Sequence, residues 1–70
     1  MKINKILGLR IRFLRKENNL TLEQLSFISG INKNYLGDLE RGSRNPTLQI
    51  LEKIANSFNI DLETLFKGIK

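Results

Sequence analysis

The 70-residue chain contains no cysteine, no histidine and only one proline. Without cysteine there are no disulfides or thiolate metal sites, and nothing points to an oxidising compartment. The lack of histidine removes the usual general base and the commonest metal ligand, and the carboxylates are not clustered, so we expect neither an enzyme nor a cofactor. No apolar run approaches the roughly 20 residues of a membrane span, and no signal peptide is evident. The sequence predicts a cytoplasmic protein with no membrane partner and no small-molecule ligand.

The positive charge of the chain is unevenly distributed. Residues 1–44 hold nine Lys or Arg against four Asp or Glu, which accounts for the whole net charge of +5, whereas residues 45–70 hold three of each sign. Such an asymmetry indicates one face for a polyanion and another for packing or self-association, unless the basic surface is merely solvated.

Apolar residues recur at helical spacing, and strand-like alternation is nowhere sustained, so we expect an all-α fold forming a single domain, 1–70. Four of the five expected helices, with the side chains of their apolar stripes, are about 4–18 (with Ile3, Leu7, Ile11 and Leu14), 21–30 (Leu22, Leu25 and Ile28), 33–41 (Leu36 and Leu39) and 47–58 (Leu48, Leu51, Ile54, Ala55 and Phe58). The fifth is a short helix after 61 that contains Leu62, Leu65 and Phe66.

The ends of these helices carry local signals. Thr21 and Gln24 have the spacing of a capping box, in which each side chain binds the backbone amide of the other residue. Asn32, Thr47 and Asp61 are predicted N-caps of the third, fourth and fifth helices. We therefore expect short helices with well-defined starts.

The second and third helices are joined by residues 29–32, SGIN, a turn of about four residues that contains a glycine. This spacing is typical of a helix-turn-helix, here residues 21–41, whose second helix is offered to the major groove of DNA. Leu36 and Leu39 suffice to dock that helix on its neighbours. Its outer side then carries the groups that reach base edges.

For base readout we expect Lys33, which suits guanine O6 and N7, Asn34, which suits adenine N6 and N7, and Asp38. Asp38 either accepts a hydrogen bond from cytosine N4 or is an intraprotein partner of Arg41 or Arg44. The residues expected to contact phosphates, which set affinity without reading sequence, are Asn32, Tyr35, Arg41, Ser43, Arg44 and Asn45, with Gln24, Arg12 and Lys16 flanking them.

Residues 21–60 resemble the phage-repressor-type (Cro/repressor, XRE-like) helix-turn-helix family, and the resemblance extends over roughly residues 9–66. The matching features are LEQLS, the turn glycine Gly30, Tyr35-Leu36, the run LERG at residues 39–42, and Pro46-Thr47 before a helix that reads LEKIA. The resemblance implies a compact five-helix, lambda-repressor-like DNA-binding domain. Small single-domain members of the family include phage repressors, controller proteins of restriction–modification systems and antitoxins.

The resemblance also implies a function and some residue roles. It implies a sequence-specific transcriptional regulator that binds a pseudo-palindromic double-stranded operator as a homodimer; the alternative is an antitoxin or anti-repressor module that binds protein. Arg15 and Glu40 match a pair that forms an interior salt bridge in relatives. Leu22 stands where many relatives carry a DNA-contacting glutamine, so it either touches a thymine methyl or packs in the core.

Two apolar sets exceed what a minimal bundle needs. Along residues 60–70, the side chains expected either to form a dimer interface or to cap the monomer's own core are Ile60, Leu62, Leu65, Phe66 and Ile69. Ile6, Leu9 and Phe13 lie off the main stripe of the first helix, and either pack against the fifth helix or join the dimer. If the protein activates transcription, Glu23 is a candidate contact for RNA polymerase.

Overall fold

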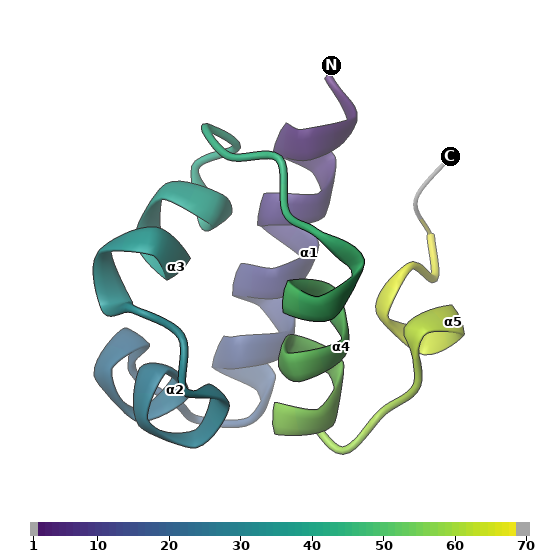
Figure 1. Ribbon diagram of the computed structural model, residues 1–70. Coiled ribbons are helices and arrows are strands. Elements are labelled where there is room, and N and C mark those ends of the chain that lie inside the picture. Colours follow the sequence, from purple (N-terminus) through teal and green to yellow (C-terminus); the bar gives the residue numbers. More distant parts are fainter. Residues whose placement is uncertain (1, 69–70) are drawn as a thin grey trace.

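The computed structural model describes residues 2–68, and over that range it consists of helices and connecting loops, with no strand. The helices are α1 (Ile3–Glu17), α2 (Leu22–Ser29), α3 (Lys33–Glu40), α4 (Leu48–Ser57) and α5 (Leu62–Leu65) (Figure 1). The all-α prediction is confirmed, and each boundary lies within one or two residues of the expected one. None of the helices in the described range combines the length and apolar character needed to cross a membrane.

The helices begin where their capping side chains are placed. The Thr21 hydroxyl accepts a hydrogen bond from the Gln24 amide at 3.0 Å, and Gln24 Oε1 accepts one from the Thr21 amide at 2.8 Å, which completes the capping box. The side chains of Asn32, Thr47 and Asp61 likewise accept hydrogen bonds from the first turns of α3, α4 and α5. These bonds satisfy amides that a helix start would otherwise leave without a partner.

All five helices contribute to one core. Its buried side chains are Leu7, Ile11, Leu25, Ile31, Leu36, Leu39, Leu51, Ile54, Ala55, Phe58 and Leu65. Leu22 is half-buried and packs against this cluster, which matches the core alternative for that residue.

Three side chains expected to point inward do not. Ile3, Ile28 and Leu48 are more than half exposed. Each lies in the first or last turn of its helix, where the apolar stripe continues beyond the neighbouring helices that would cover it. The expectation of burial was therefore wrong for these three positions.

Helix α1 crosses the carboxyl end of α3 at unusually close range because residue 8 is a glycine. A Cβ at Gly8 would lie 2.4 Å from the carbonyl oxygen of Leu39 and 2.5 Å from that of Glu40. No side chain fits between the two backbones. This contact was not predicted from the sequence, although a glycine inside a helix costs about 1 kcal/mol relative to alanine and therefore indicates a packing reason.

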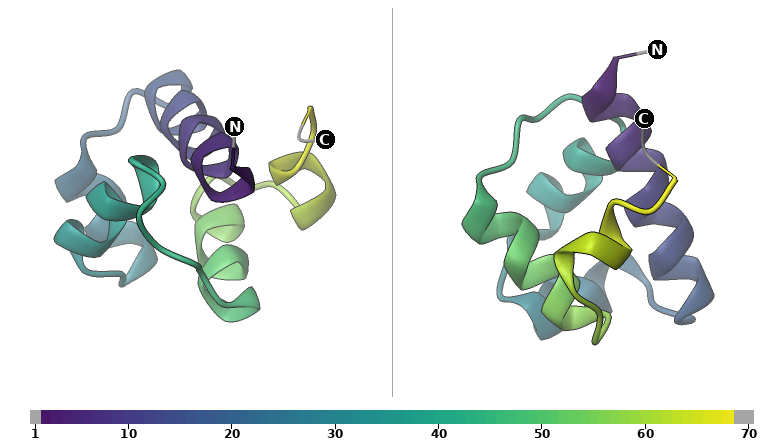
Figure 2. Two further views of the ribbon diagram at one scale, coloured as in Figure 1. Left: turned by 90° about the horizontal axis from the view of Figure 1, so that it is seen from above. Right: turned by 90° about the vertical axis from the view of Figure 1, so that its right-hand side faces the viewer.

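Helix α5 lies on the opposite side of the molecule from α2 and α3 (Figures 1 and 2). Arg10 of α1 donates hydrogen bonds to the backbone carbonyls of Leu65 at 3.1 Å and Thr64 at 2.9 Å, and so joins α1 to α5. The side chain of Leu65 is fully buried, so it has no surface to offer a second subunit. This corrects the expectation that Leu65 contributes to a dimer interface.

Candidate nucleic-acid interface

The link between α2 and α3 fixes how α3 is presented. Gly30 ends α2 in the left-handed conformation, with φ of 73°, and Asn32 then caps α3. Leu36 and Leu39 are fully buried beneath α3. The opposite side of this eight-residue helix consequently faces outward (Figure 1).

The three residues predicted to read bases all lie on α3. Lys33 and Asn34 are exposed in its first turn, and Asp38 follows Asn34 by four residues, which places the two on one face of the helix. The Lys33 ammonium lies 3.7 Å from a Glu23 carboxylate oxygen, and both side chains are well exposed. An exposed pair of this kind contributes little energy, so Lys33 can exchange it for a DNA acceptor.

Asp38 is the centre of a charged cluster at the end of α3. One carboxylate oxygen lies 2.6 Å from Nη2 of Arg41, and the other lies 3.4 Å from Nε of Arg44. The hydrogen bond from Arg41, reinforced by the one from Arg44, lowers the pKa of Asp38 below its ordinary value. Of the two alternatives for Asp38, the intraprotein pairing is present, and it involves both arginines.

The loop after α3 brings further polar groups to the same end of the helix. Ser43 donates a hydrogen bond from its hydroxyl to the Asp38 carbonyl oxygen at 3.0 Å. The guanidinium carbon of Arg44 lies 5.2 Å from the centre of the Tyr35 ring, within the range of a cation–π contact. Asn45 accepts a hydrogen bond from Asn4 at 3.5 Å. The loop side chains are therefore held against α3 and the start of α1.

The remaining residues predicted to contact phosphates are more scattered. Asn32 uses its side-chain oxygen to cap α3, and Gln24 uses its own in the capping box of α2. Their amide NH2 groups remain as donors for a phosphate. Arg12 and Lys16 are exposed on α1, outside the α2–turn–α3 unit.

The charges that the resemblance pairs, Arg15 and Glu40, form an ion pair with two hydrogen bonds, Nε to Oε2 at 2.7 Å and Nη2 to Oε1 at 3.1 Å. Arg15 also donates to the Leu20 carbonyl at 2.8 Å. The hydrogen bond to Glu40 raises the pKa of Arg15 above its ordinary value. The pair connects α1 and the turn before α2 to the carboxyl end of α3.

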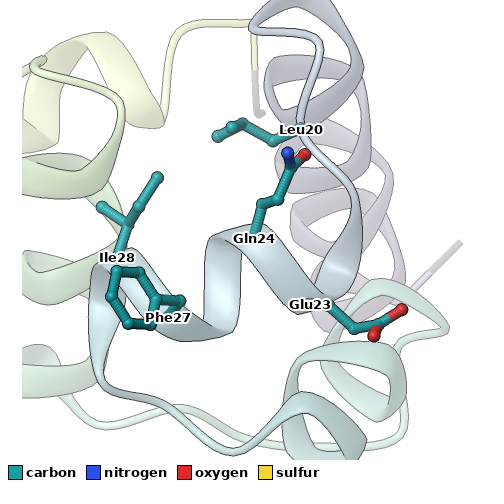
Figure 3. Close-up of a pocket in the computed structure, with 5 residues that line it drawn as sticks. All are labelled: Leu20, Glu23, Gln24, Phe27 and Ile28. Atoms are coloured by element: carbon teal, nitrogen blue, oxygen red, sulfur yellow. The ribbon is translucent and has the colours of Figure 1, made fainter.

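A second surface lies on the outer face of α2. A shallow groove of about 310 Å³ is lined by Leu20, Glu23, Gln24, Phe27 and Ile28 (Figure 3). Phe27 is 90% exposed, more than any other large apolar side chain that the structure describes. The exposure of Phe27 was not predicted, because this residue stands among the apolar residues of α2, between Leu25 and Ile28, and its spacing alone does not distinguish it from them.

A third surface is formed by α1 and α5. Leu9, Phe13 and Phe66 are exposed there, and the Arg10 guanidinium carbon lies 5.8 Å from the centre of the Phe13 ring. The other residues expected at a dimer interface, besides Leu65, are Ile60 and Leu62, which are half-buried against the core, and Ile69, which lies outside the described residues.

Across residues 2–68, no three His, Cys, Asp or Glu side chains gather as they would around a metal ion.

The short glycine turn, the two buried leucines beneath α3 and the polar outer side of α3 define a helix-turn-helix DNA-binding domain.

The chain belongs to the helix-turn-helix family, whose sequence model matches residues 11–65. It is 40% identical to the control protein C.SmaI of Serratia marcescens over 72 residues, covering 100% of this chain and 86% of the relative. The restriction–modification controller protein C.AhdI of Aeromonas hydrophila has a similar structure, with a TM-score of 0.87 and 38% identity over 90% of this chain and 96% of that one.

A second similar structure is the tetramer of the controller protein C.Esp1396I in complex with its natural 35-base-pair operator. It has a TM-score of 0.89 and 26% identity, covering 99% of this chain and 91% of that one. The predicted lambda-repressor-like, five-helix fold is confirmed by these likenesses, and the chain belongs among the DNA-binding transcriptional regulators.

Proposed function

We propose that the protein is a cytoplasmic, controller-type transcriptional regulator that binds a pseudo-palindromic operator as a homodimer, with α3 in the major groove. The observation that carries this proposal is the division of α3 into a buried side, Leu36 and Leu39, and an outward polar side. The operator-bound assembly of the related C.Esp1396I supports binding as more than one copy.

Within this proposal the polar residues have two different tasks. Lys33 and Asn34, exposed in the first turn of α3, make hydrogen bonds to base edges. Ser43, Arg44 and Asn45, in the loop after α3, contact phosphates and fix the register of the helix on the duplex. Contacts of the first kind read the bases directly, and those of the second kind do not.

We propose that the α1–α5 surface joins two subunits. Phe13 and Leu9 on α1 and Phe66 beside α5 are all at least one-third exposed, and Arg10 holds the two helices together as one surface. Burying such aromatic and aliphatic side chains stabilises association. Helix α5 lies on the side of the molecule away from α3, so a contact made through it leaves both recognition helices of a dimer available to DNA (Figure 2).

Sedimentation equilibrium tests this interface with a matched pair of variants. Phe66→Ser should weaken dimerisation at least tenfold, because a buried aromatic side chain contributes several times the energy of one methylene group. Phe27→Ser removes the same side chain from α2 and should leave the dimer intact. If Phe66→Ser and Phe27→Ser change the dimerisation constant equally, the dimer interface does not lie on the α1–α5 surface.

DNA selection tests the function itself. Duplexes bound from a random pool at about 100–150 mM salt should be enriched in a two-fold symmetric motif, with half-sites about one helical turn apart. Against that motif, Asn34→Ala should weaken binding of the operator more than binding of random DNA, whereas Arg12→Ala, which removes a predicted phosphate contact on α1, should weaken both alike and flatten the salt dependence. A folded protein that enriches no motif would refute sequence-specific binding.

The outer face of α2 favours a protein partner as well. The almost fully exposed Phe27 beside Glu23 supports a contact with RNA polymerase when the protein is bound to DNA. Phe27→Ser should then abolish activation of transcription in vitro while operator affinity stays unchanged. If instead the alternative holds and the chain is an antitoxin or anti-repressor module, partner binding should change little between 50 and 200 mM salt, whereas DNA binding through six to ten phosphates falls about 10³–10⁵-fold.

A further inference from the structure

The carboxylate of Asp38 is shared between two arginines, one on each oxygen. Arg41 lies at 2.6 Å from Oδ1, and Arg44 lies at 3.4 Å from Oδ2. The three groups together carry one net positive charge instead of the two that the arginines alone would present. This neutralisation sits at the end of α3, beside the residues proposed to contact DNA.

The Arg41 guanidinium lies against the backbone of α3 at Gly37. A Cβ at residue 37 would lie 3.3 Å from Nη1 of Arg41, so the guanidinium rests directly over Gly37. Gly37 is buried, next to the core residue Leu36 on α3. Arg41 therefore lies along the helix towards Asp38 and does not extend outward.

Arg44 is held in a similar way from the other side. Its guanidinium carbon lies 5.2 Å from the centre of the Tyr35 ring, while its Nε faces Asp38. Both arginines are thus directed to an internal anion in the absence of DNA. A phosphate that binds either of them has to compete with Asp38.

Building on the DNA-binding function proposed above, we propose that Asp38 is a specificity-determining residue. It withholds Arg41 and Arg44 from the phosphates of non-cognate DNA, and releases them when a base amino group, cytosine N4 or adenine N6, donates to its carboxylate instead. If the groove offers no amino group at this position, release of the arginines leaves the Asp38 carboxylate without a hydrogen-bond donor. That carboxylate then lies close to the DNA phosphates, which is unfavourable.

The size of the effect follows from the release of counterions. Each phosphate neutralised by a cation contributes about 0.9 to the slope of log affinity against log salt concentration. Relative to a 1 M salt reference, one such charge corresponds to about fivefold in affinity at about 0.15 M salt. Asp38 therefore lowers non-specific affinity by about this factor.

The test is Asp38→Asn, which keeps the shape of the side chain and removes its charge. Affinities for the selected operator and for a random duplex of equal length are measured by fluorescence anisotropy between about 50 and 300 mM salt. We expect random-duplex affinity to rise about fivefold at about 0.15 M salt, with a salt slope steeper by about 0.9, while operator affinity changes less than about twofold. The specificity ratio should fall accordingly.

Glu52→Gln is the matched control, because it removes the same charge from an exposed position on α4, outside the α2–turn–α3 unit. It should change both affinities by the same factor. A specificity ratio that is unchanged in Asp38→Asn, or that falls equally in Glu52→Gln, would overturn the inference. A full effect of Asp38→Asn in an Arg41→Gln/Arg44→Gln background would also overturn it.

The wild-type protein separates this inference from the proposed function. If the wild type binds every duplex alike, the proposed function fails and the inference fails with it. If the wild type discriminates and Asp38→Asn discriminates equally well, only the inference fails. Because the Asp38 ion pairs are exposed, the variant should keep its helical circular dichroism and its melting temperature to within a few degrees.

Discussion

Replacing Glu40 by alanine should be among the most damaging single changes at a charged position. The Glu40 side chain is only 6% exposed and that of Arg15 only 12% exposed, and the two share two hydrogen bonds. Glu40→Ala leaves the Arg15 guanidinium buried, with the Leu20 carbonyl oxygen as its remaining acceptor. Stranding a buried charge in this way costs about 3–5 kcal/mol.

That cost is large compared with the total stability of a chain of this length. At roughly 0.05–0.15 kcal/mol per residue, a 70-residue domain has a free energy of unfolding of about 4–10 kcal/mol. Each kcal/mol lost lowers the melting temperature of a domain of this size by about 4–8 °C. Glu40→Ala should therefore melt at least about 12 °C below the wild type, measured by circular dichroism.

Two further variants identify the cause. Asp38→Ala removes a carboxylate with an equally short contact to an arginine, but at an exposed site, and should shift the melting temperature by only a few degrees. The double variant Arg15→Met/Glu40→Leu replaces the pair with apolar side chains and should recover much of the loss. If Glu40→Ala melts within about 4 °C of the wild type, water reaches Arg15 and the argument from burial is wrong.

Three other predictions address backbone contacts, pH and the α1–α5 joint. Gly8→Ala should lower stability by about 1–3 kcal/mol in urea unfolding, because the new methyl group meets two backbone carbonyls of α3 that cannot move aside; Gly37→Ala, which meets only a flexible side chain, is the control, and an equal effect would refute the argument. The hydrogen bonds that Asp61 accepts at the start of α5 lower its pKa, so its contribution to stability is present above the unfolded pKa of about 3.9 and is lost as pH falls through the lower folded value. Asp61→Asn should therefore flatten the fall in stability below about pH 4 in urea unfolding, and an unchanged slope would contradict this role. Arg10→Gln should raise the hydrogen exchange of the α5 amides while leaving α2 and α3 protected; uniform exchange would mean that α5 is held by other contacts.

The features that the sequence predicted well depend on residues close together in the chain. The capping pair Thr21 and Gln24 needs only a three-residue spacing, and the resemblance supplied the long-range pair of Arg15 and Glu40. Helical periodicity identified most of the core. It did not show that the stripe of α4 outruns its neighbours at Leu48, because the length of a neighbouring helix is not encoded locally.

The candidate site was predicted only in part, because some of its contacts depend on how separate segments of the chain meet in space. The polar face of α3 followed from the short helix and its two leucines, but the partners of Asp38 stayed open because Arg41 and Arg44 are both within reach in the sequence. The exposure of Phe27 and the close packing at Gly8 depend on which surfaces meet in three dimensions. Neither can be obtained from spacing along one helix.

Helix α1 connects α3, which carries the residues proposed to read bases, to α5. Near its middle it packs closely on the carboxyl end of α3 at Gly8, and two residues further on Arg10 donates hydrogen bonds to the backbone of α5. In the proposed dimer, the distance between the two recognition helices is then set by the contacts of α1 with α3 and α5, and not by any residue that touches DNA. Changes at the joint between Arg10 and α5 would alter how far apart the two half-sites must lie, and leave unchanged which bases each half-site contains.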